Sequence, residues 1–251
     1  MVIDIKESKR MKKVLSMFFL SFFFCVSALQ GTVHVVESKL VDSYLTILRD
    51  KTTDCATFSE TTKKVAQSLI FATAEYLYFA DKSVETPCGP FEDGSALQSN
   101  PILIPVLRAG LSLLEAFRTH FVGAHCGFYG IKRDEETALP TTYYRNVPTQ
   151  ISDSKVVILE TMLATGGTVS MTVDDLQERY GIANENIIVV AVISAQDGVD
   201  VLEAKYPGIT IVTCAVDPIL NDKKYIVPGL GDFGDRFFGN DCEQSFKQLK
   251  S

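Results

Sequence analysis

The chain has 251 residues, with 24 Lys or Arg and 31 Asp or Glu, so its formal net charge is −7. This acidic balance excludes a protein that holds nucleic acid by bulk electrostatics. The hydrophobic fraction of 46% is ordinary for a globular protein, and the length suits one large α/β domain. The six cysteines form no CxxC pair, and the three histidines show no metal-like spacing with them. We therefore expect neither a zinc site nor a dense disulfide framework.

The N-terminal segment has the three parts of a secretory signal peptide. Basic residues at positions 9, 10, 12 and 13 precede an uncharged run, VLSMFFLSFFFCVSAL, at residues 14–29. The run is short for a bilayer span, and Val26-Ser27-Ala28 resembles a small-residue cleavage site. We separate residues 1–30, of which 11–28 look like a signal peptide, from a domain at residues 31–251. An uncleaved membrane anchor, a buried apolar helix and a start codon assigned too far upstream are open alternatives.

The first part of the domain has a mostly helical pattern over residues 32–81. Val41, Leu45 and Leu48 share one helical face, as do Val65, Leu69 and Ala72 further on. Residues 87–100 are rich in turn-forming residues and predict a loop.

From residue 102 onwards, predicted strands and helices alternate. Residues 132–148 are polar, lack periodicity and predict a long loop or hairpin. The alternation predicts an α/β fold, with a central parallel sheet flanked by helices and joined by right-handed crossovers. The predicted strands are 102–107, 123–131, 156–159, 186–194 and 209–217, and the predicted helices are 110–121, 168–180 and a segment ending at residue 206.

A turn of small residues follows the apolar strand predicted at residues 156–159. Glu160 ends the strand, and the turn Thr165-Gly166-Gly167-Thr168 opens a helix. Its backbone N–H groups and the positive end of the helix dipole point to the same place, which favours a phosphate site. The turn matches neither GxGxxG nor a loop ending in Gly-Lys-Ser/Thr. An ordinary strand-to-helix turn, bent by Gly and capped by Thr, is the alternative.

Other unusual residues fall where ligands bind in parallel sheets, beyond the carboxyl ends of the strands. Arg108 directly follows the strand predicted at 102–107. The segment YIVPGLGDFGDRFFGN, residues 225–240, carries Asp232 and Asp235. It has few apolar residues for its glycines, so we predict a loop outside the core that closely approaches a ligand.

Four blocks together resemble the uracil phosphoribosyltransferase family. They are VLRAG at 106–110, KRDEET at 132–137, MLATGG at 162–167 and YIVPGLGDFGDRFFG at 225–239. The last block separates uracil enzymes from purine phosphoribosyltransferases. VHVVES at 33–38 and LTILRD at 45–50 also resemble the N-terminal arm of the family. The resemblance implies a phosphoribosyltransferase-type fold, with a flexible loop and a hood from both ends of the chain over the base.

The implied reaction moves the phosphoribosyl group of 5-phosphoribosyl 1-diphosphate (PRPP) to N1 of uracil, giving UMP and diphosphate in pyrimidine salvage. Mg²⁺ is expected to bind through PRPP, with no ligand directly from the protein. Family members are commonly dimers or larger homo-oligomers, and some respond to GTP, which is therefore a candidate allosteric activator. PRPP is a cytosolic metabolite, so the resemblance implies a cytoplasmic enzyme, whereas the leader indicates export.

The resemblance also assigns roles to individual residues. Asp232 and Arg133 are the implied catalytic residues, and the loop at 133–144 is a candidate lid. Arg108 and Arg133 can each fork onto pyrophosphate oxygens, although either could be a surface salt bridge. Glu160 is expected to hold ribose hydroxyls. The uracil-binding residues are Ile226, Gly231, Asp232 and Phe233, although Ile226 and Phe233 could be core residues. The PRPP-binding residues are Arg108, Arg133, Glu160, Thr161, Met162, Leu163, Ala164, Thr165, Gly166, Gly167, Thr168 and Asp232.

One departure from the family concerns Glu160-Thr161, because the family usually has Asp-Pro before MLATGG. Glu reaches one methylene further than Asp, and loss of Pro frees the backbone where the loop turns. We expect reduced PRPP affinity. The alternative function is an exported or non-catalytic nucleotide- or PRPP-binding protein that retains the fold. A transferase for another base is a third hypothesis, against which the block at 225–239 argues.

Overall fold

The computed structural model describes residues 31–133, 140–149 and 151–240. The chain divides after Gln30 into two compact units, and every described residue belongs to the second, Gly31–Ser251. The segment interpreted as a leader, residues 1–30, lies outside the described residues. Among the described helices, none combines the length and apolar character that crossing a bilayer would need.

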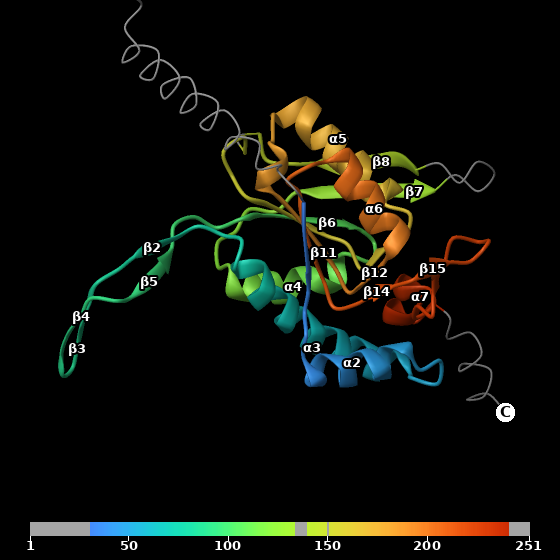
Figure 1. The fold of residues 1–251 in the computed structure, drawn as a ribbon, viewed down its shortest axis with the longest axis horizontal. Helices are drawn as coiled ribbons and strands as arrows, with labels where there is room; N and C mark the ends of the chain where they lie inside the picture. Colours follow the sequence, from blue (N-terminus) through green and yellow to red (C-terminus); the bar gives the residue numbers. More distant parts are fainter. Residues whose placement is uncertain (1–30, 134–139, 150, 241–251) are drawn as a thin grey trace, which may run out of the picture. The chain divides into compact units, whose positions relative to one another are not determined.

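A seven-stranded sheet forms the centre of this unit (Figure 1). Every neighbouring pair of its strands is parallel except β7 and β8, which form an antiparallel hairpin. The predicted α/β fold with a mostly parallel sheet is therefore confirmed. In spatial order the strands are β1 (Thr32–Val35), β13 (Thr210–Thr213), β11 (Ile187–Ala191), β9 (Val156–Leu159), β6 (Ile102–Leu107), β7 (Phe128–Arg133) and β8 (Pro140–Asn146).

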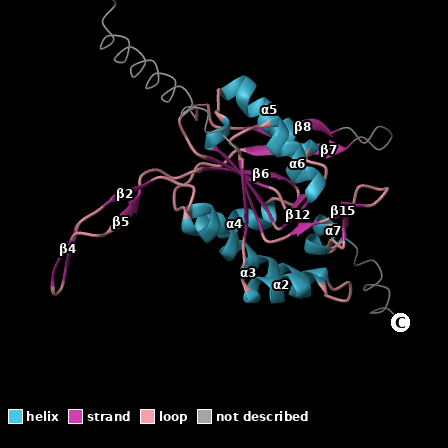
Figure 2. Cartoon of the chain, viewed as in Figure 1, coloured by secondary structure: helices cyan, strands magenta, loops and turns pink. Residues whose placement is uncertain are grey.

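Helices cover both faces of the sheet (Figure 2). Alternate residues of each strand point to opposite faces: Val157 and Leu159 of β9 pack into one core cluster, and Val156 and Ile158 into the other. The central strands are thus apolar on both sides, which explains their continuous apolar runs. One face carries α2 (Lys39–Arg49), α3 (Cys55–Ala74) and α4 (Leu111–His120), and the other carries α5 (Gly167–Tyr180) and α6 (Gln196–Lys205).

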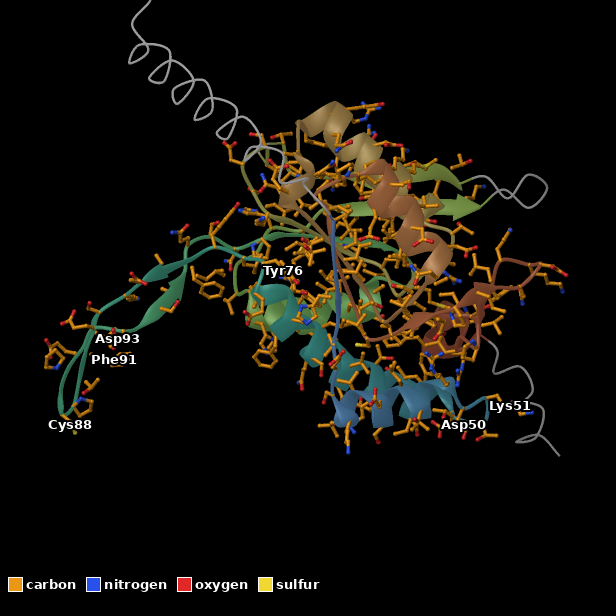
Figure 3. All side chains as sticks on the ribbon, viewed as in Figure 1. Asp50, Lys51, Tyr76, Cys88, Phe91 and Asp93 are labelled. Atoms are coloured by element: carbon orange, nitrogen blue, oxygen red, sulfur yellow. The ribbon has the colours of Figure 1, made fainter. Side chains whose placement is uncertain are left out.

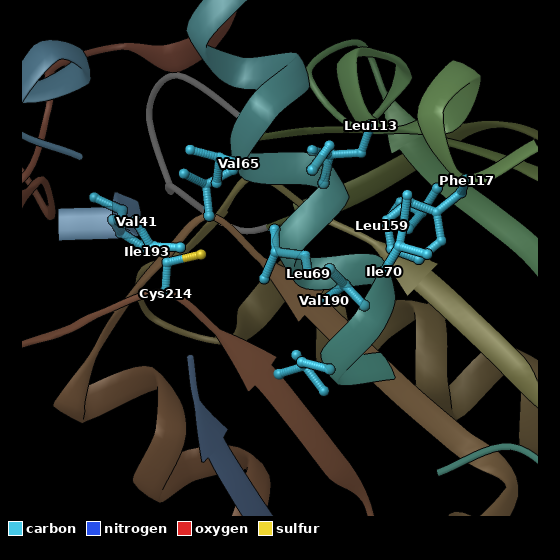
Figure 4. Packing of buried hydrophobic residues seen from close by; sticks show 14 of the residues in the cluster. Val41, Val65, Leu69, Ile70, Leu113, Phe117, Leu159, Val190, Ile193 and Cys214 are labelled. Carbon is cyan, nitrogen blue, oxygen red and sulfur yellow. The ribbon is translucent and has the colours of Figure 1, made fainter. Parts of the chain in front are cut away.

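The larger core cluster joins α3 to the sheet. Val65 and Leu69 of α3 are fully buried and belong to the same cluster as Leu159, Val190 and Phe117 (Figure 4). Apolar residues at i and i+4 along α3 place one stripe of this helix against the strands. The helix begins at the N-cap Asp54, whose carboxylate accepts a hydrogen bond from the N–H of Thr57 at 2.8 Å.

Short strands continue the chain beyond the carboxyl ends of the main sheet. The strands predicted at 186–194 and 209–217 are each interrupted, and their ends join a three-stranded parallel sheet. Its strands are β10 (Met162–Leu163), β12 (Ile193–Ala195) and β14 (Val216–Asp217). The N–H of Val192 donates to the carbonyl of Thr161 at 3.0 Å, where the pairing changes. The described chain also contains a 3₁₀ turn (Asn184–Asn186), the hairpin of β15 (Ile219–Leu220) and β16 (Ile226–Val227), and α7 (Phe233–Phe238).

The mostly helical pattern predicted over residues 32–81 is confirmed by α2 and α3. At its start, residues 32–35 form the edge strand β1, because the β-branched run TVHV pairs in parallel with β13. Residues 87–100 were predicted to be a loop, but they complete an antiparallel arm that starts at Phe79. The arm comprises β2 (Phe79–Asp81), β3 (Val84–Thr86), β4 (Gly89–Phe91) and β5 (Ser95–Leu97), with the turn residues at its tip and between its segments.

The prediction for residues 225–240 was also wrong in two respects. The segment contains β16 and α7 rather than loop alone. Its apolar residues Ile226, Leu230 and Phe233 are all at most 4% exposed and belong to the core. The segment has few apolar residues for its glycines, but these three face the core. The ratio of apolar residues to glycines does not reveal this orientation. The hairpin alternative at 132–148 is confirmed by β7 and β8, and its loop at 134–139 lies outside the described residues.

The hairpin of β7 and β8 is fastened to α5 by one carboxylate. Asp175 accepts hydrogen bonds of 2.7 Å from Tyr129 Oη of β7 and from Arg145 Nη1 of β8. Burial opposes ionisation of Asp175, but these partners, together with Arg179, hold its pKa below the ordinary value. Burial and the hydrogen bond to this carboxylate raise the pKa of Tyr129.

Truncation of Phe58 tests the packing of α3 against α7. Phe58 is fully buried, and its ring centroid lies 5.1 Å from that of Phe233. We expect Phe58→Ala to lower the free energy of unfolding by about 3–5 kcal/mol, through lost burial and an unfilled cavity. Phe71→Ala, on the same helix but 67% exposed, should change it by less than about 1 kcal/mol. Urea unfolding of both variants measures the difference, and equal losses would contradict this packing.

Candidate functional site

The carboxyl ends of β6 and β9 open into a cleft of about 410 Å³. Its lining comes from three separate parts of the chain: the segment after β6, the segment after β9 and the C-terminal segment. Parallel strands with right-handed crossovers bring such distant segments to one edge. The lining residues are Ala109, Glu160, Thr161, Met162, Ala164, Lys223, Lys224, Tyr225, Ile226, Gly231, Asp232, Phe233 and Gly234.

The predicted phosphate turn lies next to this cleft. Gly166 adopts φ +77°, a left-handed conformation that L side chains rarely adopt, and α5 begins at the next residue, Gly167. The turn therefore directs the first turn of α5 towards a small hollow. The residues around this hollow are Glu160, Met162, Leu163, Ala164, Gly166, Gly167, Thr168 and Val169. Thr165 accepts the N–H of Gly167 at 3.4 Å through Oγ1.

Gly198 of α6 is a residue that the sequence analysis did not single out. A Cβ at this position would lie 2.4 Å from the carbonyl oxygen of Ala164, so only Gly lets α6 approach the turn this closely. The carbonyl of Gly198 in turn would lie 3.3 Å from a Cβ at Gly166. The signal available in the sequence was an isolated Gly inside a helical segment, which indicates a close backbone approach.

Glu160 follows β9 directly and is partly buried. Its carboxylate Oε1 accepts a hydrogen bond of 2.9 Å from the backbone N–H of Thr161. A Pro at position 161 could not donate this bond. The two departures from the family pattern, a longer acid and a residue with an N–H group, are therefore structurally coupled. Thr161 itself is buried, and its carbonyl accepts from the N–H groups of Val192 and Ile193.

Arg108 lies beyond the end of β6, with its side chain 64% exposed. Its Nη2 is 3.5 Å from Oδ1 of Asp235 in α7. The following turn packs closely on the sheet, because a Cβ at Gly110 would lie 2.2 Å from the carbonyl oxygen of Leu159. Arg133, the other predicted arginine, ends β7 and pairs through its backbone with Pro140, but its side chain lies outside the described residues.

The C-terminal segment forms a wall of the cleft. Gly231 and Asp232 are exposed there, whereas Ile226 and the ring of Phe233 are buried behind them. The Phe233 ring contacts the rings of Phe58 and Phe237, so this side chain belongs to the core, as the sequence left open. Asp232 is the N-cap of α7, and its Oδ1 accepts the N–H of Asp235 at 3.0 Å. This bond sets the orientation of the carboxylate.

Two lysines in the lining were not recognised from the sequence. Lys223 and Lys224 lie between β15 and β16, and Lys224 adopts φ +64° in this connection. Asn221 shapes the connection by accepting the N–H groups of Lys223 and Tyr225 at Oδ1. Lys223 and Lys224 line the same cleft as Glu160 and Asp232 only because the hairpin folds back, so no local pattern signalled them.

The described part of the chain contains no group of three or more His, Cys, Asp or Glu side chains placed to hold a metal ion. Two carboxylates, Glu160 and Asp232, line the same cleft. A Mg²⁺ ion that takes most of its ligands from a phosphorylated substrate and water needs no more than one or two protein carboxylates. The residues present therefore fit a metal carried in by such a substrate.

Comparisons with known proteins identify the family of this chain. The model of the uracil phosphoribosyltransferase family matches residues 35–240. Uracil phosphoribosyltransferases of Natranaerobius thermophilus and Bifidobacterium adolescentis are 37% and 39% identical to this chain; each alignment covers 82% of it and 98% of the relative. The solved structure of the AQ2163 protein of Aquifex aeolicus matches with a TM-score of 0.74 and 32% identity, covering 82% of this chain and 98% of that one. The chain therefore belongs to the uracil phosphoribosyltransferase family and has the phosphoribosyltransferase fold.

Proposed function

We infer that this protein transfers the phosphoribosyl group of PRPP to N1 of uracil, giving UMP and diphosphate in pyrimidine salvage. The observation that carries the inference is the placing of the MLATGG turn and the PGLGDFGD segment on one cleft, in a chain of this family. The reaction breaks the bond from C1′ to the diphosphate oxygen and forms the bond from C1′ to N1, while N1 loses its proton. Positioning and charge compensation carry most of such a reaction.

The turn from Ala164 to Thr168 is the proposed seat of the 5′-phosphate. The left-handed Gly166 and the start of α5 support this assignment, since backbone N–H groups and the helix dipole favour an anion there. Glu160 is proposed to accept hydrogen bonds from the ribose hydroxyls. Its bond from the Thr161 N–H holds the carboxylate beside both the hollow and the cleft. Met162 and Leu163, the residues of β10, connect these two groups.

Arg108 and Arg133 are proposed to bind the diphosphate. Arg108 is mostly exposed, and its ion pair with Asp235 is long at 3.5 Å, so little opposes a change of partner. A guanidinium can form two parallel hydrogen bonds with a phosphate group, which a Lys cannot copy. Arg133 ends β7, and residues 140–144 of the candidate lid belong to strand β8 rather than to a loop, whereas residues 134–139 lie outside the described residues.

The uracil site is proposed to lie against Ile226, Gly231, Asp232 and Phe233. Backbone groups at such a wall can read the donor and acceptor pattern of uracil, because a mismatched base strands a buried polar group. The burial of the Phe233 ring supports a role for its backbone rather than its side chain. Asp232, exposed at the cleft and oriented by Asp235, is the proposed catalytic carboxylate.

Mg²⁺ is proposed to arrive with PRPP, and Glu160 and Asp232 are the residues whose carboxylates face the same cleft. When bound, it would offset the negative charge that develops on the leaving diphosphate. Activation by GTP, cytoplasmic location and the removal of residues 1–30 stay predictions from the sequence.

The antiparallel arm supports a homo-oligomer. Its residues are largely exposed and include Phe79, Val84 and Phe91, each between 44% and 48% exposed. Figure 3 labels Phe91, Asp93 and Cys88 along the outer part of this arm, away from α3 and α4. A two-stranded hairpin is only marginally stable in water by itself, and apolar side chains on it favour burial. We propose that the arm packs against a second copy of this chain.

Replacement of Asp232 tests the proposed catalytic carboxylate. Asp232→Asn keeps a side chain that can accept the N–H of Asp235 but removes the negative charge. We expect kcat for UMP formation from PRPP, Mg²⁺ and labelled uracil to fall at least about 100-fold. Asp222→Asn, at an exposed residue beside the lysines, is the control and should keep wild-type activity. Activity in Asp232→Asn equal to that of the control would refute the assignment.

A methyl group at Gly198 tests the packing beneath the phosphate turn. Gly198→Ala should push the carbonyl of Ala164 away and weaken PRPP binding by about tenfold or more, because the turn loses its geometry. Asp200→Ala, at an exposed position of the same helix, should leave the dissociation constant unchanged. Isothermal titration calorimetry with PRPP and Mg²⁺ measures both values. Unchanged affinity in Gly198→Ala would show that the turn tolerates the shift.

A charge on the arm tests the proposed oligomer. Phe91→Glu places a carboxylate in the apolar part of the arm, so we expect the dimer or larger assembly to dissociate at least tenfold more readily. Glu92→Lys changes a neighbouring exposed residue without removing apolar surface and is the control. Sedimentation equilibrium gives the mass of each. A wild-type monomer, or an assembly indifferent to Phe91→Glu, would contradict the role of the arm.

A further inference from the structure

Arg49, the last residue of α2, contacts the segment that follows β16, and the proposed site gives it no role. Its Nη1 and Nη2 donate to the two carboxylate oxygens of Asp217 at 2.7 Å each, the bidentate geometry of a strong ion pair. Nη1 also donates to the carbonyl oxygen of Gly229 at 2.8 Å. Figure 3 marks the end of α2 by the next two residues, Asp50 and Lys51.

Asp217 completes a closed set of contacts around Gly229. It ends β14, is 5% exposed, and accepts the N–H of Gly229 at 2.9 Å through Oδ2. One ion pair therefore holds both backbone polar groups of Gly229. A buried carboxylate needs partners of this kind, and loss of either ion would leave the other poorly compensated.

The segment held in this way leads directly into the wall of the cleft. Gly229 adopts φ +59°, and a Cβ there would lie 2.1 Å from the carbonyl oxygen of Ile226, so the turn is tight. Gly231 and Asp232 follow within three residues and line the cleft. A displacement of Gly229 would therefore move the backbone that faces the base.

Arg236 fixes the neighbouring residue from the other side. Its Nη1 donates to the carbonyl of Leu230 at 2.6 Å, and Nη2 donates to that of Asp50 at 2.6 Å. The guanidinium also lies over the ring of Phe58, 4.5 Å from its centroid. The end of α2 is thus the surface against which residues 229 and 230 are placed.

We propose that Arg49 and Asp217 are positioning residues for uracil. They hold residues 227–232 where the backbone of the wall can pair with the base, although neither lines the cleft. Because β14 pairs with β12, and β12 with β10, the same small sheet also supports the start of the phosphate turn. This inference rests on the proposed function, and it assigns a specific part of substrate binding to a pair that lies outside the cleft.

The test uses the full chain with Arg49→Lys, Asp217→Asn and the control Asp174→Asn. Lys keeps the charge of Arg49 but cannot bridge Asp217 and Gly229 with the same planar fork. Asp174 is a matched control, because its carboxylate also has two partners at 2.7 and 2.8 Å, Lys205 and Tyr206, and does not line the cleft. We expect KM for uracil to rise at least tenfold in both test variants. KM for PRPP and kcat should stay within about threefold of wild type, because the bond from the Asp235 N–H still orients Asp232 and only uniform binding of uracil is lost.

Hydrogen exchange of the peptide covering residues 227–232 provides the second measurement. It should become at least tenfold faster in Arg49→Lys and Asp217→Asn, and not in Asp174→Asn, while peptides of α3 keep their protection. If Asp217→Asn does not fold, Arg49→Lys alone decides. An unchanged KM for uracil, or equal rises in both KM values, would overturn the inference while the function stands. A wild-type protein that forms no UMP would overturn the proposed function and this inference with it.

Discussion

The structure depends on the burial of parallel strands on both of their faces. Val156 to Leu159 are fully buried, with alternate side chains in two separate core clusters. Such a strand needs helices on both faces of the sheet. The connections that contain these helices bring the chain back parallel to the preceding strand. The carboxyl ends of β6, β9 and β11 consequently meet at one edge. Polar residues that follow these strands are brought together although they are far apart in the sequence.

At that edge, close backbone packing shapes much of the site. Gly110 lies against the carbonyl of Leu159, Gly198 against that of Ala164, and Gly229 against that of Ile226, each closer than a Cβ would permit. These contacts join the segment after β6 to β9, and α6 to the phosphate turn. The third joins the C-terminal wall of the cleft to the hairpin of β15 and β16. A site built from backbone groups needs such close packing, because the packing fixes the positions of the elements that carry these groups.

The pair Glu160-Thr161 illustrates how two departures from a family pattern can be coupled by one hydrogen bond. The longer carboxylate is caught by an N–H group that the usual Pro would lack. The expectation of reduced PRPP affinity considered only the reach of the acid and the freedom of the backbone. The hydrogen bond restricts both, so the orientation of Glu160 is set by its own neighbour rather than left to solvent.

The sequence by itself determined the fold class, the family and most of the residues along the cleft. Strand-to-helix alternation and contiguous motifs are local properties, so apolar runs, the TGGT turn and the PGLGDFGD block could be recognised without knowing any long-range contact. The β7–β8 hairpin stayed one of two alternatives, a long loop or a hairpin, because a polar segment without periodicity does not specify its strand pairing.

Only the tertiary structure decided the features that depend on distant partners. Residues 32–35 become a strand because β13 offers an edge, and residues 79–97 pair across a turn whose register no local pattern gives. Phe233 is core because Phe58 of α3 meets it, and Gly198 matters because Ala164 lies above it. The ion pair of Arg49 with Asp217 joins residues 168 positions apart. Each of these contacts forms between two elements that lie far apart in the sequence. Its free energy depends on both partners together, so neither segment reveals it when read alone.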